Sequence, residues 1–421
     1  MKKILIAVFA ALVTAAWVLP VMAADVKIGG ELRERGIWVD NEKQTDGAQA
    51  RDVKYIEQRL RLNVDAELES NVKVFVSLQD SRNWGDEGST ATTGNDAQAV
   101  DLSQAYVVFS NILDQPLSIK VGRQVLAYGE HRLIGSFEWS NNARRFDAIK
   151  LSYNHEVFNV DLWTAKVDEG GTTTTTSTTG FGQKDLDFNG IYATVKAIPM
   201  NTLDLYYFQD RDGATTVKRD VRTMGARLNG GAINIDWTAE YAKQGGRSSM
   251  SSTEVETKQD SNAYAIKAGY TIPQAVNLRI GAEYDKATGD KAGTTDKNEA
   301  FRNLYPTNHP LYGFTDDITW SDMKAWSINV GIKPMDNLKV AAEYWKYKAD
   351  EVASGQSDDL GKEINVKANY NITKNTSLEV AYAIRDAGNA GDSGFPKDYA
   401  GRAIPKNEDA TFAYLMLDVK F

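Results

Sequence analysis

The sequence has no cysteine among its 421 residues. The chain therefore cannot form a disulfide, a thiolate metal site or a CxxCH haem attachment. Histidine occurs only three times, at His131, His155 and His309, and these positions indicate no metal triad and no Ser-His-acid set. We therefore predict that the protein is not an enzyme, with no catalytic residue, no metal site and no cofactor.

Long hydrophobic runs are also missing. After residue 23, no segment approaches the roughly 18 consecutive apolar residues that a transmembrane helix needs, which excludes a helical membrane protein. An excess of positive charge is absent too, since 57 acidic residues face 48 Lys and Arg residues and the formal net charge is -9. Nucleic acid as a ligand would require a basic surface, so it is not expected.

The amino-terminal segment has the pattern of a secretory signal peptide. Lys2 and Lys3 precede an apolar stretch from Ile4 to Leu19, and residues 21–23 end in small residues suited to cleavage. We expect residues 1–23 to be removed and residues 24–421 to form one domain.

Strict alternation of residue type is the strongest positive signal in the chain. Apolar or neutral residues occupy every second position from Ile56 to Leu68, and charged or polar residues such as Arg59 and Arg61 lie between them. This period of two is typical of a β-strand with one apolar and one charged face. About eighteen segments of similar length repeat it, which predicts an all-β fold: a closed antiparallel transmembrane β-barrel in a bacterial outer membrane.

The predicted connections alternate in length. Short, turn-rich ones such as Asn229-Gly230-Gly231 and Pro273-Gln274 predict periplasmic turns, and long ones such as residues 286–321 predict extracellular loops. The last strand ends in Phe421. This end resembles the signal that outer-membrane barrels present to the barrel-assembly machinery. Outer-membrane lipid and lipopolysaccharide are the other expected partners.

Four arginines are predicted to share one wall of the lumen. Arg33 and Arg35 on the first strand, and Arg59 and Arg61 on the second, face inward by alternation, together with Glu31 and Glu57. They can form an electrostatic ladder that selects permeating anions. They can equally form cross-strand ion pairs that keep the wall rigid. The sequence leaves both alternatives open.

Residues 122–145 break the alternation without being of low complexity. Aromatic, Gly and Arg residues follow one another closely in this connection, which favours a folded loop over a solvated one. In a barrel of this width, we expect such a loop to fold inward and narrow the bore.

The residues of this stretch resemble those of the alginate-export family of outer-membrane porins. The resemblance is carried by Gly122-Arg123-Gln124, Arg132-Leu133-Ile134-Gly135, Trp139 and Arg144-Arg145-Phe146-Asp147-Ala148. It implies that Arg123, Arg132, Arg144 and Arg145 contribute to an arginine-rich constriction. We therefore expect a porin for passive diffusion or export of a hydrophilic, anionic solute or polysaccharide. The alternative is a barrel sleeve that encloses a redox or secretion partner.

Overall fold

The computed structural model describes residues 25–40, 52–85, 100–169, 185–213, 219–248, 257–389 and 409–421. The predicted signal peptide, residues 1–23, lies outside the described residues, as do parts of six of the predicted long loops. Within the described ranges, the strands are β1 (Asp25–Asp40), β2 (Val53–Glu69), β3 (Val72–Asn83), β4 (Asp101–Phe109), β5 (Leu117–Gln124), β6 (Phe146–Asn154), β7 (Phe158–Glu169), β8 (Asp185–Val195), β9 (Asn201–Asp212), β10 (Arg219–Ala232), β11 (Ile235–Ser248), β12 (Thr257–Ile272), β13 (Leu278–Ala287), β14 (Lys297–Asn298), β15 (Met323–Met335), β16 (Leu338–Ala349), β17 (Asp359–Thr373), β18 (Thr376–Asp386) and β19 (Ala410–Lys420). A single 3-10 turn, η2 (Ile112–Asp114), lies between β4 and β5 in the described part of the chain.

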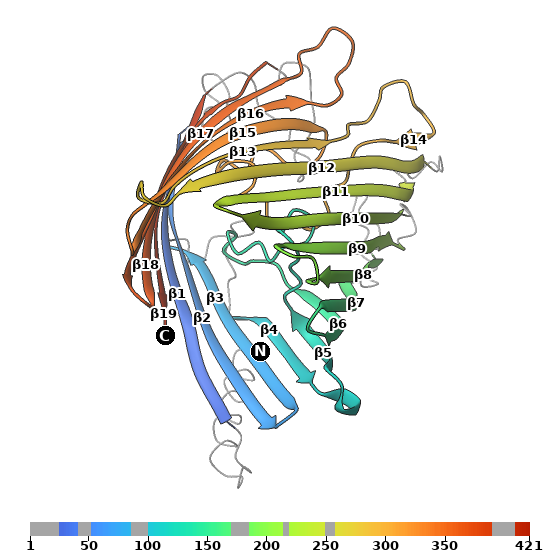
Figure 1. Cartoon of the computed structure of the whole chain (residues 1–421), viewed down its shortest axis with the longest axis vertical. Helices are drawn as coiled ribbons and strands as arrows, with labels where there is room; N and C mark the ends of the chain where they lie inside the picture. The colour runs from blue at the N-terminus through green and yellow to red at the C-terminus, as the bar shows by residue number, and fades with distance from the viewer. Residues whose placement is uncertain are drawn as a thin grey trace.

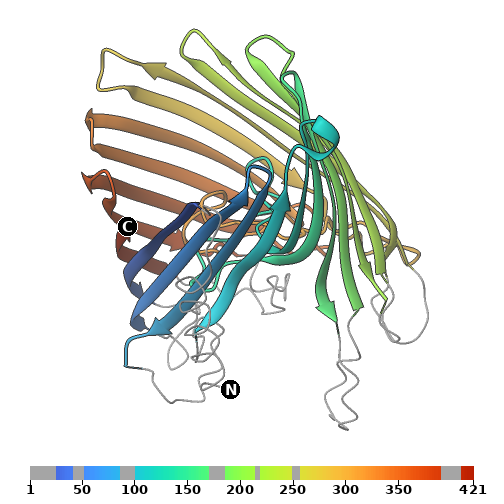
Figure 2. The ribbon, with the colours of Figure 1, turned by 90° about the horizontal axis from the view of Figure 1, so that it is seen from below.

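Eighteen of the strands in the described ranges close into one antiparallel barrel, which confirms the predicted fold class. Each strand of the wall pairs with its neighbours along the chain, and β1 pairs with β19 to close the seam. The two-residue strand β14 stands outside this wall and pairs in parallel with β12. Figures 1 and 2 show the strands surrounding an interior into which connecting loops fold.

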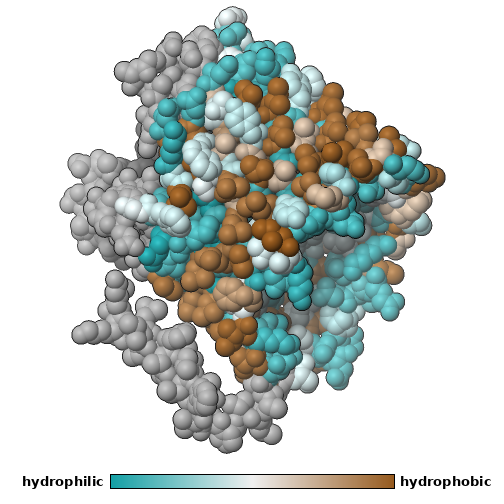
Figure 3. Space-filling model, turned by 90° about the vertical axis from the view of Figure 1, so that its left-hand side faces the viewer, coloured by the Kyte–Doolittle hydropathy of each residue, from teal (hydrophilic) through white to brown (hydrophobic). Residues whose placement is uncertain are grey.

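The outer face of the wall is apolar, as the alternation predicts. Ile328 in the middle of β15 and Val380 on β18 are about half exposed, and Trp326 and Tyr382 share this outward face. Figure 3 shows hydrophobic side chains gathered across one outer side of the molecule, with hydrophilic ones beside them. A surface of this kind is stable against lipid and unfavourable in water.

The short connections lie at one end of the barrel, but one predicted turn is misplaced. Asn229-Gly230-Gly231 belongs to β10, and the reversal occurs at Ile233-Asn234. Both of these residues have a positive φ, 49° and 66°. Two left-handed residues in succession form the tight hairpin turn whose twist matches that of the flanking strands. The glycines preceding it continue the ladder instead of ending it.

Candidate pore and its inward loops

The connection between β5 and β6, residues 125–145, folds into the lumen and is called the first inward loop here. β5 continues to Gln124, so residues 122–124 of the predicted loop belong to the strand. Leu126, Leu133 and Ile134 of the loop are 4% exposed or less. The loop is therefore a packed part of the barrel interior.

The register of β1 and β2 arranges the four arginines of the predicted ladder in three rows. Arg33 lies opposite Arg59, with Glu31 opposite Arg61 on one side and Arg35 opposite Glu57 on the other. The four arginines are only 2% to 7% exposed. Their guanidinium groups are therefore covered, and what covers them is the first inward loop.

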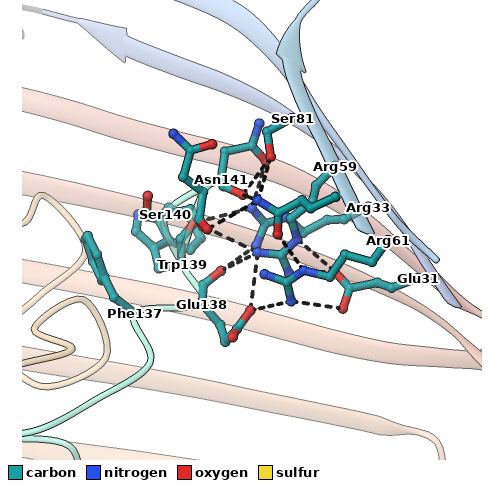
Figure 4. A network of polar contacts seen from close by, with 12 residues as sticks. Glu31, Arg33, Arg59, Arg61, Ser81, Phe137, Glu138, Trp139, Ser140 and Asn141 are labelled. Atoms are coloured by element: carbon teal, nitrogen blue, oxygen red, sulfur yellow. Dashed lines mark hydrogen bonds and ion pairs between the residues drawn. The ribbon is translucent and has the colours of Figure 1, made fainter. Parts of the chain in front are cut away.

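Backbone carbonyls of the loop bind the ladder directly (Figure 4). Arg33 Nη1 donates to the carbonyl of Glu138 at 2.6 Å, and Arg59 Nη1 donates to the same oxygen at 3.1 Å. Arg59 Nη1 also lies 3.3 Å from the carbonyl oxygen of Ser140. The Asn141 side chain accepts a bond from Arg33 Nη2 at 3.0 Å. Charged donors to carbonyl oxygens make strong hydrogen bonds, so these arginines anchor the loop to the wall.

The carboxylate of Glu138 completes this anchor. It accepts from Arg61 Nη1 at 2.7 Å, and it lies 2.9 Å from Arg145 Nη2 and 3.3 Å from Arg59 Nη1. Burial by itself would raise the pKa of Glu138, but Arg61, Arg145 and Arg59 outweigh it and lower that pKa to about 2. Glu138 is therefore ionised at neutral pH.

Arg35 holds a different part of the same loop. Its Nε donates to Glu57 at 3.1 Å across the two strands. Its guanidinium carbon lies 3.7 Å from the ring centroid of Trp139, which is a close cation–π contact. Arg33 and Arg35 of β1 therefore contact the first inward loop at its backbone carbonyls and at the indole of Trp139, respectively.

Arg132 reaches the opposite side of the lumen. The side chain is 1% exposed and forms ion pairs with Glu283 and Asp285 of β13, the second at 3.2 Å. Its Nη1 also donates to the hydroxyl of Tyr312 at 2.8 Å. The first inward loop is thus attached to β13 as well as to β1 and β2.

Arg144 also binds loop backbone. Its Nη1 donates to the carbonyl of Pro306 at 2.7 Å and to that of Gly135 at 3.3 Å. It thereby joins the first inward loop to a second one.

Arg123 lies elsewhere, and its predicted place in the constriction is wrong. Its partner in the register is Asp147, which also forms the ion pair with it at 2.8 Å. Residues of this parity, such as Val121 and Ile149, are exposed on the outer face of the wall. The inward positions of β6 are occupied by Phe146 and Ala148, which are buried. Alternation from Ile149 is the signal that places Arg123 outside.

A second inward loop, residues 288–322 between β13 and β15, occupies the region in which residues 286–321 are predicted to form a long extracellular loop. Its large side chains are instead buried inside the barrel: Phe301, Leu304, Tyr305, Tyr312, Phe314, Ile318 and Trp320 are all 5% exposed or less. The density of aromatic residues between 301 and 320 is the signal that sequence reasoning missed. The same density of aromatic residues predicts the first inward loop.

The two inward loops form a short parallel bridge with each other. Ile134 pairs with Tyr305, with hydrogen bonds from Gly135 N to Tyr305 O at 2.8 Å and from Tyr305 N to Leu133 O at 2.8 Å. The amide of Phe137 donates to the hydroxyl of Thr307 at 2.9 Å. The loops therefore form one assembly across the lumen.

Wall residues hold the second loop from several sides. Tyr305 and Arg302 both bind Asp210 of β9, each at 2.9 Å. On β17, Glu363 accepts from the hydroxyl of Thr315 at 2.7 Å. Tyr347 of β16 donates to the carbonyl of Tyr312 at 3.0 Å. These contacts distribute the attachment of the loop around the barrel.

Two absences within the described residues bear on other functions. No helix in those ranges is long and apolar enough to cross a membrane. No group of three or more His, Cys, Asp or Glu residues there has the arrangement of a metal site.

Comparison with known proteins identifies the family. The family model described as alginate export matches residues 24–400. The chain belongs to the alginate-export family. Proteins of this family are outer-membrane channels, so this alginate-export protein is a bacterial outer-membrane channel and not an enzyme. No curated protein matches it.

Several solved porin structures share the fold of this alginate-export protein at low sequence identity. Pseudomonas aeruginosa OccK8 (OprE) has a TM-score of 0.64 and 14% identity, with 94% of this chain and 98% of that chain covered. Acinetobacter baumannii OccAB2 has a TM-score of 0.62 and 13% identity, with the same coverage. Pseudomonas aeruginosa OccK2 (OpdF), solved in complex with glucuronate, has a TM-score of 0.60 and 10% identity, again covering 94% and 98%.

Proposed function

We propose that this channel carries hydrophilic solutes by passive diffusion and prefers those with negative charge, including acidic sugars and their polymers. The observation that carries the proposal is the composition of the loop anchor. Five guanidinium groups meet four carboxylates there: Arg33, Arg35, Arg59, Arg61 and Arg145 against Glu31, Glu57, Glu138 and Asp418, the last of which lies opposite Arg33 on β19. The surplus positive charge lies at a site where water is partly excluded, so its field is screened less than it would be at an open surface.

Conduction requires that a solute be attracted without being held. In the anchor, the guanidinium groups are already bound to loop carbonyls and carboxylates, so a passing anion experiences their field without displacing their partners. Weak attraction of this kind permits both entry and exit. OccK2 in complex with glucuronate supports the solute class by analogy, because a barrel of the same fold accommodates a carboxylated sugar.

The alternative of a sleeve around a redox or secretion partner is less favoured. A protein inside the lumen would have to displace two loops that are hydrogen-bonded to β1, β2, β9, β13, β16 and β17. Each broken contact would leave buried polar groups without partners, which is costly.

The reversal potential in a potassium chloride gradient tests the proposal. We expect the purified protein in a planar bilayer to pass chloride better than potassium, and Arg145→Gln to reduce that preference. Arg123→Gln is the matched control, because Arg123 lies on the outer face and pairs with Asp147. A cation-selective wild type would refute the anion preference, and a barrel that never conducts would refute the channel.

The ends of the chain carry two further proposals. Residues 1–23 are proposed to direct export and to be removed, which amino-terminal sequencing of the mature protein tests.

Phe421 is proposed to be recognised by the barrel-assembly machinery. Its amide and carbonyl bond to Gly30 at the barrel seam, and its side chain is 60% exposed. Phe421→Ala should lower the amount of folded barrel in the outer membrane, whereas an unchanged amount would contradict this role.

A further inference from the structure

A hollow of about 360 Å³ lies in the lumen beside the first inward loop. Loop residues 127–129 form one side of it, and inward-facing residues of β7 to β10, with Asn154 at the end of β6, form the rest. The volume falls within the roughly 300–1,000 Å³ that is typical of small-molecule sites. Asn154 and Asn159 flank the short turn between β6 and β7, so the hollow lies toward the periplasmic end of the barrel.

Each charged group that lines this hollow has a partner of opposite sign. Asp204 accepts from Arg227 Nη1 at 2.6 Å, and Asp161 accepts from Lys150 Nζ at 2.9 Å. The carboxylates therefore present oxygen acceptors while their charge is balanced. The hollow is consequently different from the loop anchor, where guanidinium groups outnumber carboxylates.

Amide, hydroxyl and phenol groups supply the remaining polar lining. These residues are Asn154, Asn159, Thr194, Thr202, Tyr128 and Tyr192. Such groups both donate and accept hydrogen bonds, as sugar hydroxyls do. Thr194 already donates to Asp204, and Asn159 accepts from Lys196, so neutral ligand hydroxyls would add hydrogen bonds to groups that are held in place. An anion would find no unpaired cation in this lining, because Arg227 is bound to Asp204.

Stacked aromatic rings give the hollow a rigid apolar side. The ring of Tyr128 lies 4.9 Å from that of Trp163 and 4.6 Å from that of Tyr192, measured between centroids, and both pairs are stacked. The Tyr128 hydroxyl donates to Asp161 at 2.7 Å, which fixes the ring. Gly129, with φ of 59°, turns the chain here in a conformation that favours glycine. A few fixed polar groups beside aromatic surface are typical of small-ligand sites.

We propose that this hollow is a binding subsite for the hydroxylated ring of a sugar, and that it recognises the neutral ring rather than an acidic group. The proposal builds on the channel function proposed above and adds a solute class to it. A saccharide would bind to the periplasmic side of the first inward loop before or after it passes the anchor. Binding is expected to be weak, because a channel must release its solute.

Calorimetric titration of the detergent-solubilised barrel tests the proposal without requiring conduction. The probes are a neutral disaccharide of hexoses and a uronate disaccharide of the same size. The neutral disaccharide is expected to bind at least as tightly as the uronate. Binding of the uronate ten times more tightly would overturn the assignment.

Two substitutions locate the site. Thr202→Trp fills the hollow while leaving the Asp204–Arg227 and Asp161–Lys150 pairs in place, and it should weaken neutral-sugar binding at least tenfold. Thr164→Trp is the matched control, because Thr164 is exposed and lies opposite Ile149 on the outer face. Asn159→Ala should weaken binding roughly threefold to tenfold through one lost hydrogen bond. Equal binding by the wild type and Thr202→Trp would refute the subsite.

Single-channel recording separates this proposal from the channel function. Neutral sugar added on the side of the short turns should interrupt the current of the wild type and not that of Thr202→Trp. A barrel that binds the sugar but passes no current would contradict the channel function alone. A barrel that conducts but binds neither disaccharide would contradict the subsite alone.

Discussion

The indole of Trp139 stacks on the imidazole of His309, with ring centroids 3.5 Å apart and planes 5° apart. Trp139 belongs to the first inward loop and His309 to the second. His309 is in turn bound to Asp316 at 2.9 Å, and the Arg35 guanidinium carbon lies 3.7 Å from the Trp139 ring centroid. One aromatic contact thus connects both loops to the barrel wall.

Trp139→Ala should loosen this connection and raise the single-channel conductance, with noisier current, because both loops lose their shared contact. The control is Trp326→Ala, which removes a tryptophan that is 42% exposed on the outer face. Recordings in symmetric salt measure the effect. An unchanged conductance and noise level for Trp139→Ala would show that the stack does not hold the loops in place.

Arg35→Met should destabilise the barrel by about 3–5 kcal/mol, because it leaves Glu57 buried beside an apolar side chain. The side chains of Arg35 and Glu57 are 2% and 1% exposed, so water cannot replace the lost partner. The double variant Arg35→Met with Glu57→Leu should recover most of the loss. The free energy of unfolding in urea, measured in lipid vesicles, tests both. Equal stability of the single and double variants would contradict the explanation.

Alternation predicts which side chains of the wall face lipid and which face the lumen, because successive side chains of a strand point to opposite faces of the sheet. Ile56 and Leu60 are exposed on the outer face, while Arg59 and Arg61 are buried inside, as the pattern in β2 predicts. Applied consistently, the same rule would have placed Arg123 outside. The resemblance of the motif around Arg123 to a family constriction outweighed the parity of its own strand.

Turn and loop positions were harder to predict because local sequence did not determine them. Gly230 and Gly231 are common in turns, yet they pair with Trp237 and Asp236 within the ladder. The inward fold of the second loop depends on partners far along the chain, such as Asp210 for Tyr305 and Glu363 for Thr315. No periodicity within residues 288–322 encodes those contacts.

Acidification should release the loop anchor through Glu138. The pKa of Glu138 is lowered to about 2 from an ordinary value of 4.5, with Arg61, Arg145 and Arg59 overcoming the opposing effect of burial. The folded state therefore favours the ionised form, so this contribution to stability is fully present above pH 4.5 and is lost as the pH falls through 2. Current noise in bilayers should rise over this interval.

Glu138→Gln isolates this carboxylate from the other acids of the lumen. It should be noisier than the wild type at pH 7 and should change less than the wild type between pH 4.5 and pH 2. If both proteins respond to acid equally, another group is responsible for the transition.

Gly135→Ala should separate the two inward loops where they pair most closely. A Cβ at this position would overlap the hydroxyl oxygen of Thr307 and would lie 2.7 Å from the Cβ of His131. The loops would have to part, which would weaken the bond from Gly135 N to Tyr305 O, now 2.8 Å, and the bond from Phe137 N to Thr307, now 2.9 Å. Two hydrogen bonds at roughly 0.5–1.5 kcal/mol each make this a substantial loss of local stability, while the barrel wall stays intact.

Faster protease cleavage within residues 125–145 measures the opening of the loops. Adding Thr307→Gly removes the overlapping side chain and lets the bond from Gly135 N to Tyr305 O re-form, while the bond from Phe137 N to Thr307 stays lost. The double variant should therefore be cleaved more slowly than Gly135→Ala alone but faster than the wild type, and a rate equal to that of Gly135→Ala would contradict the steric cause.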